Sequence, residues 1–401
     1  MQPAIIVGGG IGGLAAGLAL ARQGIASHIY EQAQAFTEIG AGLQLGPNAV
    51  RRLQGWGLGN ALRDCAFAPD TLRIFSAETA HLLGELRLGN HAQAKYGAPY
   101  LTVHRADLHR VLLNAAQAQG VALHANHTFS NLEYAPDSNS VKVQFQSGSA
   151  SQAPLLIAAD GIASAVRQQF FLGSAASNHE PTGHCVFRGL VAQKDLPAAL
   201  RSRVITSWLG THFHVVQYPV RGEDWLNVAV IVHNRAVNHV RFNPWNSAVS
   251  PDFVAHALGT IVTPLADLIA AMPSWTAWTG YEHPPLTHAA QMAQGRIALL
   301  GDAAHAMRPY LAQGAGMAIE GADALAVCLA AFPREGTWVQ GVPAALQAYA
   351  HQRWQRNARV QARARRNGHI FHAGGAVAWA RNLALRALGE KVIDLPWLYA
   401  G

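Results

Sequence analysis

Two hydrophobic patterns divide the chain. Short and almost wholly apolar runs, typical of strands buried on both faces, occupy residues 4–7, 155–158 and 296–300. Apolar and polar residues alternate between residues 185 and 233, which is typical of strands with one buried face. The chain therefore combines fully buried strands in its first half and near residue 300 with a β-rich middle.

The elements predicted from these patterns follow one another in a definite order. Strands are expected at residues 4–7, 27–30, 72–75, 82–88, 100–103, 121–132, 141–145, 155–158, 186–191, 204–208, 212–218, 225–232 and 296–300. Helices are expected at residues 14–21, 47–62, 105–113, 163–171 and 251–272, onward from residue 314, and through the tail from residue 343, with breaks near residues 374–375 and 396.

This order predicts an α/β fold in which one domain interrupts another. We expect a Rossmann-like nucleotide-binding domain formed by residues 1–75, 100–180 and 281–342. A β-sheet domain that binds substrate is expected at residues 76–99 and 181–280, and residues 343–401 are expected to form a helical C-terminal segment.

Composition adds constraints on partners and compartment. Half of the 401 residues are apolar and the net charge is +7, with the densest basic stretch at residues 353–366. We interpret that stretch as a solvated helix, because no nucleic-acid-binding motif accompanies it. Three cysteines without a CxxC motif, and no apolar run of about 18 residues, indicate a cytoplasmic protein without disulfides, nucleic acid or membrane partners.

A glycine-rich turn follows the first predicted strand. Gly8, Gly10 and Gly13 have GxGxxG spacing, a helical pattern follows them, and Glu31 ends the next predicted strand. Such glycines allow a tight turn, a close approach by a pyrophosphate and close helix packing, while an acidic residue accepts hydrogen bonds from a ribose. The motif predicts a dinucleotide site and leaves NAD and FAD open.

Two further motifs lie far along the chain. The first is Asp160-Gly161 with Ser164 and Arg167, and the second is Gly301-Asp302-Ala303-Ala304-His305 with Pro309 and Gln313-Gly314. Together with the glycine turn, they resemble the FAD-dependent aromatic hydroxylases. Similarity to the salicylate, 3-hydroxybenzoate and 6-hydroxynicotinate hydroxylases is carried by Gly40-Ala41-Gly42-Leu43-Gln44, Pro47-Asn48 and His104-Arg105-Ala106-Asp107-Leu108.

The resemblance implies that FAD binds non-covalently in the Rossmann-like domain. The three glycines would hold its pyrophosphate, Glu31 its adenosine ribose, and Arg105 its ribityl–phosphate region. Asp160 would lie near FAD and the groove where NAD(P)H docks, and Asp302 would bind the ribityl chain or the pyrophosphate.

The start of the Ala-rich helix is expected to face the flavin ring. The backbone N–H groups of Gly314 and Ala315 would lie at the N1–C2=O edge of the ring. Reduced flavin carries negative charge at this edge, and a helix N-terminus stabilises an anion.

Polar residues that could act on a substrate lie on one predicted strand. His212, His214 and Tyr218 have a spacing of two and four, so we expect them to share one face. A histidine and a tyrosine can polarise a ring hydroxyl, and the resemblance implies that His214 and Tyr218 face the ligand. Gln313 would be a further polar group beside the ring. No third residue has the spacing of a metal ligand, so no metal is expected.

Two arginines are candidates for binding a substrate carboxylate. Arg308 precedes Pro309 near the expected position of the flavin ring, and Arg188 lies on a predicted strand of the sheet domain. An arginine can bind a carboxylate through two parallel hydrogen bonds. The chain departs from the family pattern at Ala306, where proline is usual, and at Gly321, where aspartate often follows the glutamate.

The resemblance implies an enzyme that uses NADH or NADPH and dioxygen to hydroxylate a small aromatic ring through a flavin hydroperoxide. A monomer or a homodimer is expected. Two alternatives remain open from the sequence: another flavoenzyme of the same fold, such as an epoxidase, a tailoring hydroxylase or an NAD(P)H oxidase, and a flavin-binding protein without catalytic activity.

Overall fold

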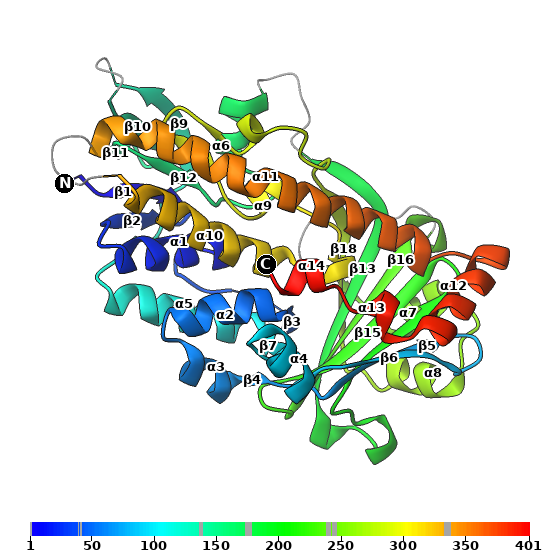
Figure 1. Ribbon diagram of the computed structural model, residues 1–401. Coiled ribbons are helices and arrows are strands. Elements are labelled where there is room, and N and C mark those ends of the chain that lie inside the picture. Colours follow the sequence, from blue (N-terminus) through cyan, green and yellow to red (C-terminus); the bar gives the residue numbers. More distant parts are fainter. Residues whose placement is uncertain are drawn as a thin grey trace.

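The computed structural model describes residues 2–38, 40, 42–135, 139–172, 179–237, 242, 247–332 and 338–401. Ala41 lies outside the described residues. Within these ranges the strands form four sheets. Helices and sheets alternate as expected for an α/β protein (Figure 1).

The sheet that carries the glycine turn has the order β19-β20-β12-β1-β2-β8. Its strands are β1 (Ala4–Val7), β2 (Ser27–Tyr30), β8 (Ala122–His124), β12 (Leu156–Ala158), β19 (Ala293–Gln294) and β20 (Ile297–Leu299). The strands from β20 to β8 are parallel, and β1, β12 and β20 are buried throughout. Burial on both faces explains their apolar sequences.

Both faces of this sheet are covered. A side chain on Gly17 of helix α1 (Ile11–Arg22) would meet Ile29 of β2, whereas the next residue, Tyr30, stacks on Phe145. Helix α1 therefore covers one face, together with α5 (Arg105–Ala118) and α10 (Gly314–Ala330). A smaller sheet of β9 (Phe129–Tyr134), β10 (Val141–Phe145) and β11 (Ala150–Ala153) covers the other.

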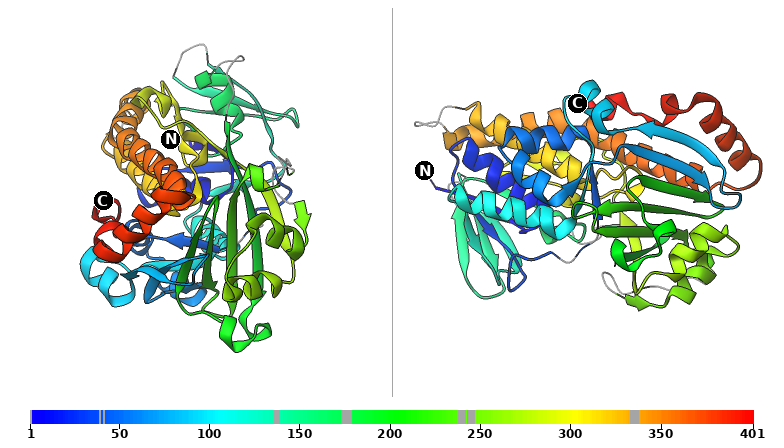
Figure 2. Two further views of the ribbon diagram at one scale, coloured as in Figure 1. Left: turned by 90° about the vertical axis from the view of Figure 1, so that its right-hand side faces the viewer. Right: turned by 90° about the horizontal axis from the view of Figure 1, so that it is seen from below.

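A large sheet fills the other half of the molecule (Figures 1 and 2). Its order is β17-β18-β13-β16-β15-β14-β5-β6, with β5 (Thr71–Ser76), β6 (Leu82–Arg87), β13 (Glu180–Ala192), β14 (Ile205–Gly210), β15 (Phe213–Val220), β16 (Trp225–His233), β17 (Ser247–Val249) and β18 (Trp275–Glu282). One face packs on α7 (Pro251–Leu258) and α8 (Thr263–Ala270) through residues such as Phe187 and Val215. Because side chains alternate, Arg188, His214 and Tyr218 lie on the opposite face.

A second small sheet and several helices connect these two parts. The sheet has the order β3-β7-β4, with β3 (Gly42–Leu45), β4 (Ala66–Phe67) and β7 (Leu101–His104). The remaining helices are α2 (Pro47–Gly55), α3 (Gly59–Cys65), α4 (Gly89–Tyr96), α6 (Ala165–Arg167), α9 (Asp302–His305), α11 (Trp338–Phe371), α12 (Gly375–Leu388), α13 (Glu390–Ile393) and α14 (Pro396–Tyr399). Short 3₁₀ turns occur at Gln193–Asp195, Ala198–Leu200, Asn234–Val237, Ala289–Gln291 and Pro309–Leu311, and a π turn at Gln168–Leu172.

Helix α11 spans both halves of the molecule (Figure 1). It begins at Trp338, earlier than predicted, and contains Pro343. A proline lacks the N–H that would bond to the carbonyl four residues earlier. That carbonyl, of Val339, instead accepts a hydrogen bond of 2.7 Å from Nη1 of Arg296, so the helix continues through the proline.

Three boundaries differ from the prediction. Strand β5 pairs in parallel with β14, so the large sheet begins near residue 71 rather than at residue 76. The single helix expected at residues 47–62 is two helices, α2 and α3, and the strand expected at 121–132 is divided into β8 and β9. The basic stretch of α11 is not a fully solvated surface, because Arg353 and Arg356 form buried ion pairs with Glu320.

Candidate active site

The glycine turn between β1 and α1 leaves no room for side chains at Gly8 and Gly13. Gly8 has a φ of +104°, and a side chain on it would lie 2.3 Å from the carbonyl oxygen of Ala159. A side chain on Gly13 would lie 1.9 Å from the carbonyl oxygen of Gly8. Gly10 is the N-cap of α1 and, as a glycine, has no side chain that could cap the helix. The free N–H groups of the first turn are therefore available to an anion.

Two side chains hold this turn in place. The N–H of Gly9 donates a hydrogen bond of 2.6 Å to Oε2 of Glu31, and the N–H of Ala33 donates one of 2.8 Å to Oε1. The carbonyl oxygen of Gly9 lies 2.8 Å from Nε2 of His109 on α5. Glu31 thus stands at the end of β2, beside the turn, where an acid that binds a ribose is required.

The second motif packs directly against the third. Nη1 of Arg167 donates hydrogen bonds to the carbonyl oxygens of Ala303 and Ala304, at 3.3 and 3.0 Å. Asp160 follows β12, and its Oδ1 is buried without a hydrogen-bond partner in the described residues. Burial raises the pKa of Asp160, although a hydrogen bond from Ser164 opposes the effect. An unsatisfied buried oxygen of this kind is expected where a ligand is missing.

Asp302 and Arg105 lie close to the glycine turn. Asp302 is exposed to solvent, yet surrounding protein atoms desolvate it and raise its pKa, while Arg105 opposes that rise. Because solvent reaches Asp302 although protein atoms surround it closely, Asp302 lines a concave surface. Arg105 forms an ion pair with Glu38, with Nε and Oε2 at 2.9 Å, and Glu38 Oε1 lies 3.4 Å from the position of a side chain on Gly10.

The N-terminus of α10 completes this arrangement. Gln313 is its N-cap, and the backbone of Gly314 is so close to Asp302 that a side chain there would lie 3.9 Å from Oδ1. Nε2 of Gln313 is buried without a hydrogen-bond partner among the described residues. The backbone of Gly314 and Ala315 thus borders the same concave surface as Asp302.

These residues fit an FAD molecule. The close glycine turn suits a pyrophosphate, Glu31 suits a ribose, and the first turn of α10 offers N–H groups to an electron-rich ring edge. The buried, unsatisfied Asp160 Oδ1 and Gln313 Nε2 indicate that a polar ligand belongs between the motifs. When bound, FAD would be held by Gly8, Gly10, Gly13, Glu31, Arg105, Asp160, Asp302, Gly314 and Ala315.

A row of polar side chains on the large sheet faces away from α7 and α8. His214 and Tyr218 lie on β15 and are almost fully buried. Tyr218 forms a hydrogen bond with Gln44 and has the positive charge of Arg188 nearby, but burial dominates and raises its pKa. Burial, with a smaller contribution from His184, lowers the pKa of His214 to about 3.

His212 does not share the face of His214. It precedes β15 in an exposed turn, with a φ of +72°, and its N–H donates to the carbonyl oxygen of His372 at 3.0 Å. The shared-face prediction is therefore wrong for His212, because β15 begins only at the next residue, Phe213. The partner of His214 is instead His372, with Nδ1 and Nε2 at 2.8 Å.

The two candidate arginines have different surroundings. Nε and Nη2 of Arg308 donate to Oε1 of Glu282 at 2.9 and 2.7 Å, and that carboxylate is buried. Pro309 is exposed and begins a 3₁₀ turn. Arg188 has no carboxylate partner in the described part of the chain, and its guanidinium lies 4.6 Å from the ring centre of Trp278.

Sequence reasoning missed a polar network behind the site. Nδ2 of Asn48 donates to Gln313 Oε1 at 3.0 Å and to Glu320 Oε1 at 2.6 Å. In the sequence, Asn48 stands out only as part of the Pro47-Asn48 motif, and Glu320 only because Gly321 follows it where aspartate is usual. The signal in the sequence was a lone amide at the apolar start of α2.

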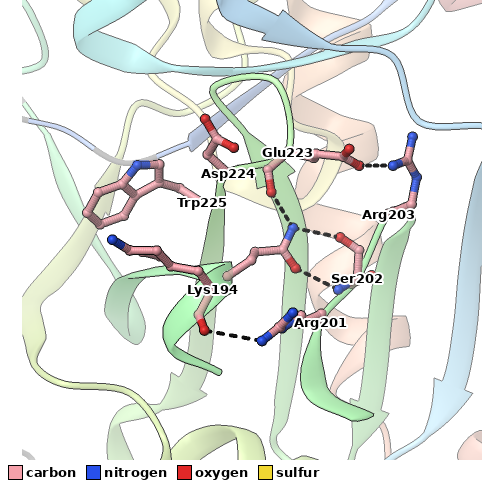
Figure 3. Close-up of a pocket in the computed structure, with 9 residues that line it drawn as sticks. Lys194, Arg201, Ser202, Arg203, Glu223, Asp224 and Trp225 are labelled. Atoms are coloured by element: carbon pink, nitrogen blue, oxygen red, sulfur yellow. Dashed lines mark hydrogen bonds and ion pairs between the residues drawn. The ribbon is translucent and has the colours of Figure 1, made fainter. Parts of the chain in front are cut away.

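A hollow of about 800 Å³ lies apart from these motifs, between the end of β13 and the start of β16 (Figure 3). The hollow is lined by both cations and anions, namely Lys194, Arg201, Arg203, Glu223 and Asp224. Arg203 forms an ion pair with Glu223. Bonds within the hollow also satisfy the amide of Gln193. We assign no ligand to it.

Neither a metal centre nor a membrane-spanning helix is found in the described ranges. No group of three histidine, cysteine, aspartate or glutamate residues there could hold a metal ion. Among the helices that the structure describes, none combines the length and apolar character needed to cross a bilayer.

Residues 1–364 match the family described as the FAD binding domain. The chain belongs to this family. It is 36% identical over 400 residues to 3-hydroxybenzoate 6-hydroxylase of Polaromonas naphthalenivorans, covering 99% of this chain and 95% of that protein. It is 31% identical over 370 residues to 6-hydroxynicotinate 3-monooxygenase of Bordetella bronchiseptica, covering 89% of this chain and 88% of that protein.

Solved structures extend the similarity to the fold and cofactor. The structure of Klebsiella pneumoniae HpxO complexed with FAD and uric acid has a TM-score of 0.82 and 25% identity, and the match covers 98% of this chain and 94% of that one. The predicted fold and cofactor are confirmed: this chain is an FAD-dependent enzyme of the monooxygenase type with a mixed α/β fold.

Proposed function

We propose that this flavoprotein hydroxylates a small aromatic acid of the hydroxybenzoate, salicylate or hydroxynicotinate type, using NADH or NADPH and dioxygen. The observation that carries the proposal is the row formed by Arg188, Tyr218 and His214 on one face of the large sheet. The row combines a cation with two ring-polarising groups, and the relatives named above act on hydroxylated ring acids.

Arg188 would bind the carboxylate of the substrate. Burial lowers its pKa, as does the charge of Arg105, so a negative partner would stabilise it. Tyr218 contributes in the opposite direction and lies nearby. The charge of Glu38 also raises this pKa, but no carboxylate among the described residues forms an ion pair with Arg188. A substrate carboxylate could therefore form that pair, and the guanidinium would fix the ring by paired hydrogen bonds.

Tyr218 and His214 would act on the ring hydroxyl. The raised pKa of Tyr218 keeps its hydroxyl protonated, so it can donate a hydrogen bond. The lowered pKa of His214 keeps its imidazole neutral, and a neutral imidazole has one nitrogen that can accept a hydrogen bond. Withdrawing the proton of a ring hydroxyl makes the neighbouring ring carbon more nucleophilic, as oxygen transfer requires.

The remaining residues position the reacting groups. Bound FAD would supply the redox chemistry, taking electrons from NAD(P)H and delivering one oxygen atom of dioxygen to the ring. Gln313 would lie beside the ring, and the N–H groups of Gly314 and Ala315 would stabilise negative charge. Tyr310 and Phe371, which surround His214, would exclude water from the ring.

The direct test is a screen of the purified holoenzyme. NADH and NADPH consumption would be followed with salicylate, hydroxybenzoates and hydroxynicotinates, and products identified by mass spectrometry. We expect at least one ring acid to stimulate consumption several-fold and to gain one oxygen atom. No stimulation by any of them, or consumption without a hydroxylated product, would refute the proposal.

A further inference from the structure

A chain of buried polar groups leads from α11 to the N-terminus of α10. Arg353 and Arg356 on α11 donate to Glu320 on α10, with nitrogen–oxygen distances of 2.7 to 2.9 Å. Glu320 Oε1 also accepts a hydrogen bond of 2.6 Å from Nδ2 of Asn48, and the same Nδ2 donates to Oε1 of Gln313 at 3.0 Å. The side chains of Asn48, Gln313 and Glu320 are all at most 2% exposed.

The ionised carboxylate determines the direction of every hydrogen bond in this chain. Burial alone would raise the pKa of Glu320, but hydrogen bonds from Arg356 and the nearby arginine charges lower it to about 2. A carboxylate only accepts hydrogen bonds, so Asn48 must turn its NH₂ toward it. The second hydrogen of that NH₂ then reaches Gln313, which must offer its carbonyl oxygen.

Gln313 is left with an unused donor. Its NH₂ is buried and has no partner among the described residues. A side chain on Gly316 would lie 2.9 Å from Gln313 Oε1, so the glycine leaves room for the Gln313 amide. An unsatisfied buried NH₂ costs free energy, so its retention favours a ligand atom that accepts a hydrogen bond.

The unused donor lies beside the row of proposed substrate-binding residues. Tyr310, three residues before Gln313, packs on His214 with ring centres 4.9 Å apart. Met317, one helical turn after Gln313, belongs to the same buried cluster as Tyr218. Gln313 therefore lies in a segment with one end packed on His214 and the other in the cluster that contains Tyr218. These are the two residues proposed to act on the ring hydroxyl.

We propose that Glu320, acting through Asn48, orients Gln313 as a fixed donor and so makes the site selective for a ring oxygen over a ring amine. This rests on the proposed function, since it assumes that a ring acid binds beside Gln313. Glu320 and Asn48 are positioning residues, because neither contacts the substrate in this arrangement. A ring hydroxyl or oxo group accepts the Gln313 hydrogen bond, whereas an amine would present hydrogens to it.

The variant E320Q, which removes the negative charge, should reverse the direction of the hydrogen bonds between Glu320, Asn48 and Gln313. Nε of Arg356 and Nη2 of Arg353 both donate to the Oε2 position, so the new amide keeps its oxygen there. Its NH₂ then takes the Oε1 position facing Asn48, and the bond from Nη2 of Arg356 to that position is lost. Asn48 then turns its oxygen toward both neighbours, Gln313 turns its NH₂ toward Asn48, and the Gln313 oxygen faces the ligand. The variant E320D keeps a carboxylate and is the conservative control.

Dissociation constants of matched ring acids test this. The oxidised holoenzyme, without NAD(P)H, would be titrated with 3-hydroxybenzoate, 3-aminobenzoate, 6-hydroxynicotinate and 6-aminonicotinate, and binding followed through the flavin absorbance. We expect the wild type and E320D to prefer the hydroxy acid by about 10- to 100-fold. E320Q should lose that preference or favour the amino acid.

A second pair of variants guards against misfolding of E320Q. N48L removes the donor to Gln313, so its preference should fall to about threefold or less, because the NH₂ of Gln313 is then no longer directed at the ligand. N357L removes another buried asparagine, which contacts Arg353 and Met292 but not Gln313, and should keep the wild-type preference. An unchanged preference in both E320Q and N48L overturns the inference alone. A wild type that binds no ring acid overturns the proposed function and the inference with it.

Discussion

Arg188 and Arg308 show how the surroundings of one residue type decide its use. Both are arginines near the proposed ring site, and nothing in the sequence favours one over the other. The structure separates them. Arg308 already forms an ion pair with Glu282, whereas Arg188 lies over the ring of Trp278 and has no carboxylate partner among the described residues. An arginine that is bonded to a buried carboxylate is not available to a second one without breaking an ion pair.

Replacing Arg188 with methionine should therefore weaken substrate binding. We expect R188M to raise KM for a carboxylated ring substrate by at least about 10-fold, the loss of a charged hydrogen-bonded pair, with a smaller effect on a ring phenol without a carboxylate. R308M should leave the ratio of KM for acid and phenol unchanged, although it will lower stability. Steady-state kinetics on both substrates decide the matter, and a selective loss in R308M instead would assign the carboxylate to Arg308.

Single residues also mark the limit of sequence reasoning. The spacing of His214 and Tyr218 fixed their shared face, because strands have a period of two. The same reasoning failed for His212, since the hairpin turn between β14 and β15 was not visible in the pattern. Contacts across the chain, such as that between Asn48 and Glu320, join residues 272 positions apart and leave no local trace.

At the scale of elements, the β1–turn–α1 unit was fully predictable. The apolar strand, the glycines and the following helix are local features. The structure forms the strand as predicted, and the helix begins three residues earlier and ends one residue later than predicted. The start of α11 and the placement of β5 could not be predicted, because both depend on partners distant in sequence. Arg296 binds the carbonyl group that Pro343 leaves without an N–H donor, and β14 pairs with β5 in the large sheet.

Two glycines in this unit give a matched pair of variants. G13A would place a methyl group 1.9 Å from the carbonyl oxygen of Gly8 and should separate α1 from the turn. We expect its affinity for FAD to fall by about 100-fold or more, since an overpacked site costs several kcal/mol. G12A, whose methyl group would meet Ala318 at an ordinary 3.7 Å, should retain FAD. Flavin content and the dissociation constant after reconstitution are the readouts, and equal retention by both variants would contradict the turn's role.

At the scale of the whole molecule, buried histidines couple folding to pH. Burial lowers the pKa of His184 to about 4 and those of His214, His283 and His305 to about 3, from 6.5. Below pH 6.5 the unfolded chain binds protons that the folded chain cannot, so stability is full above that pH and falls below it. Each histidine contributes a slope of about 1.4 kcal/mol per pH unit.

Chemical denaturation at a series of pH values between 7.5 and 5 measures this effect. The free energy of unfolding should be nearly flat above pH 6.5 and fall steeply below it. H283Q removes one of the four groups and should reduce the slope by about 1.4 kcal/mol per pH unit. A wild-type profile that stays flat down to pH 5, or an H283Q slope equal to that of the wild type, would show that these histidines are not buried as described.

The central claim is that FAD, a ring acid and dioxygen meet between the glycine turn, α10 and the large sheet. The most direct test is the reaction of the holoenzyme with NAD(P)H, a ring acid that stimulates its consumption, and ¹⁸O-labelled dioxygen. We expect a ring product that carries one labelled oxygen atom, in an amount approaching that of the NAD(P)H consumed. A product without the label, or consumption of NAD(P)H that yields only hydrogen peroxide with every ring acid, would contradict it.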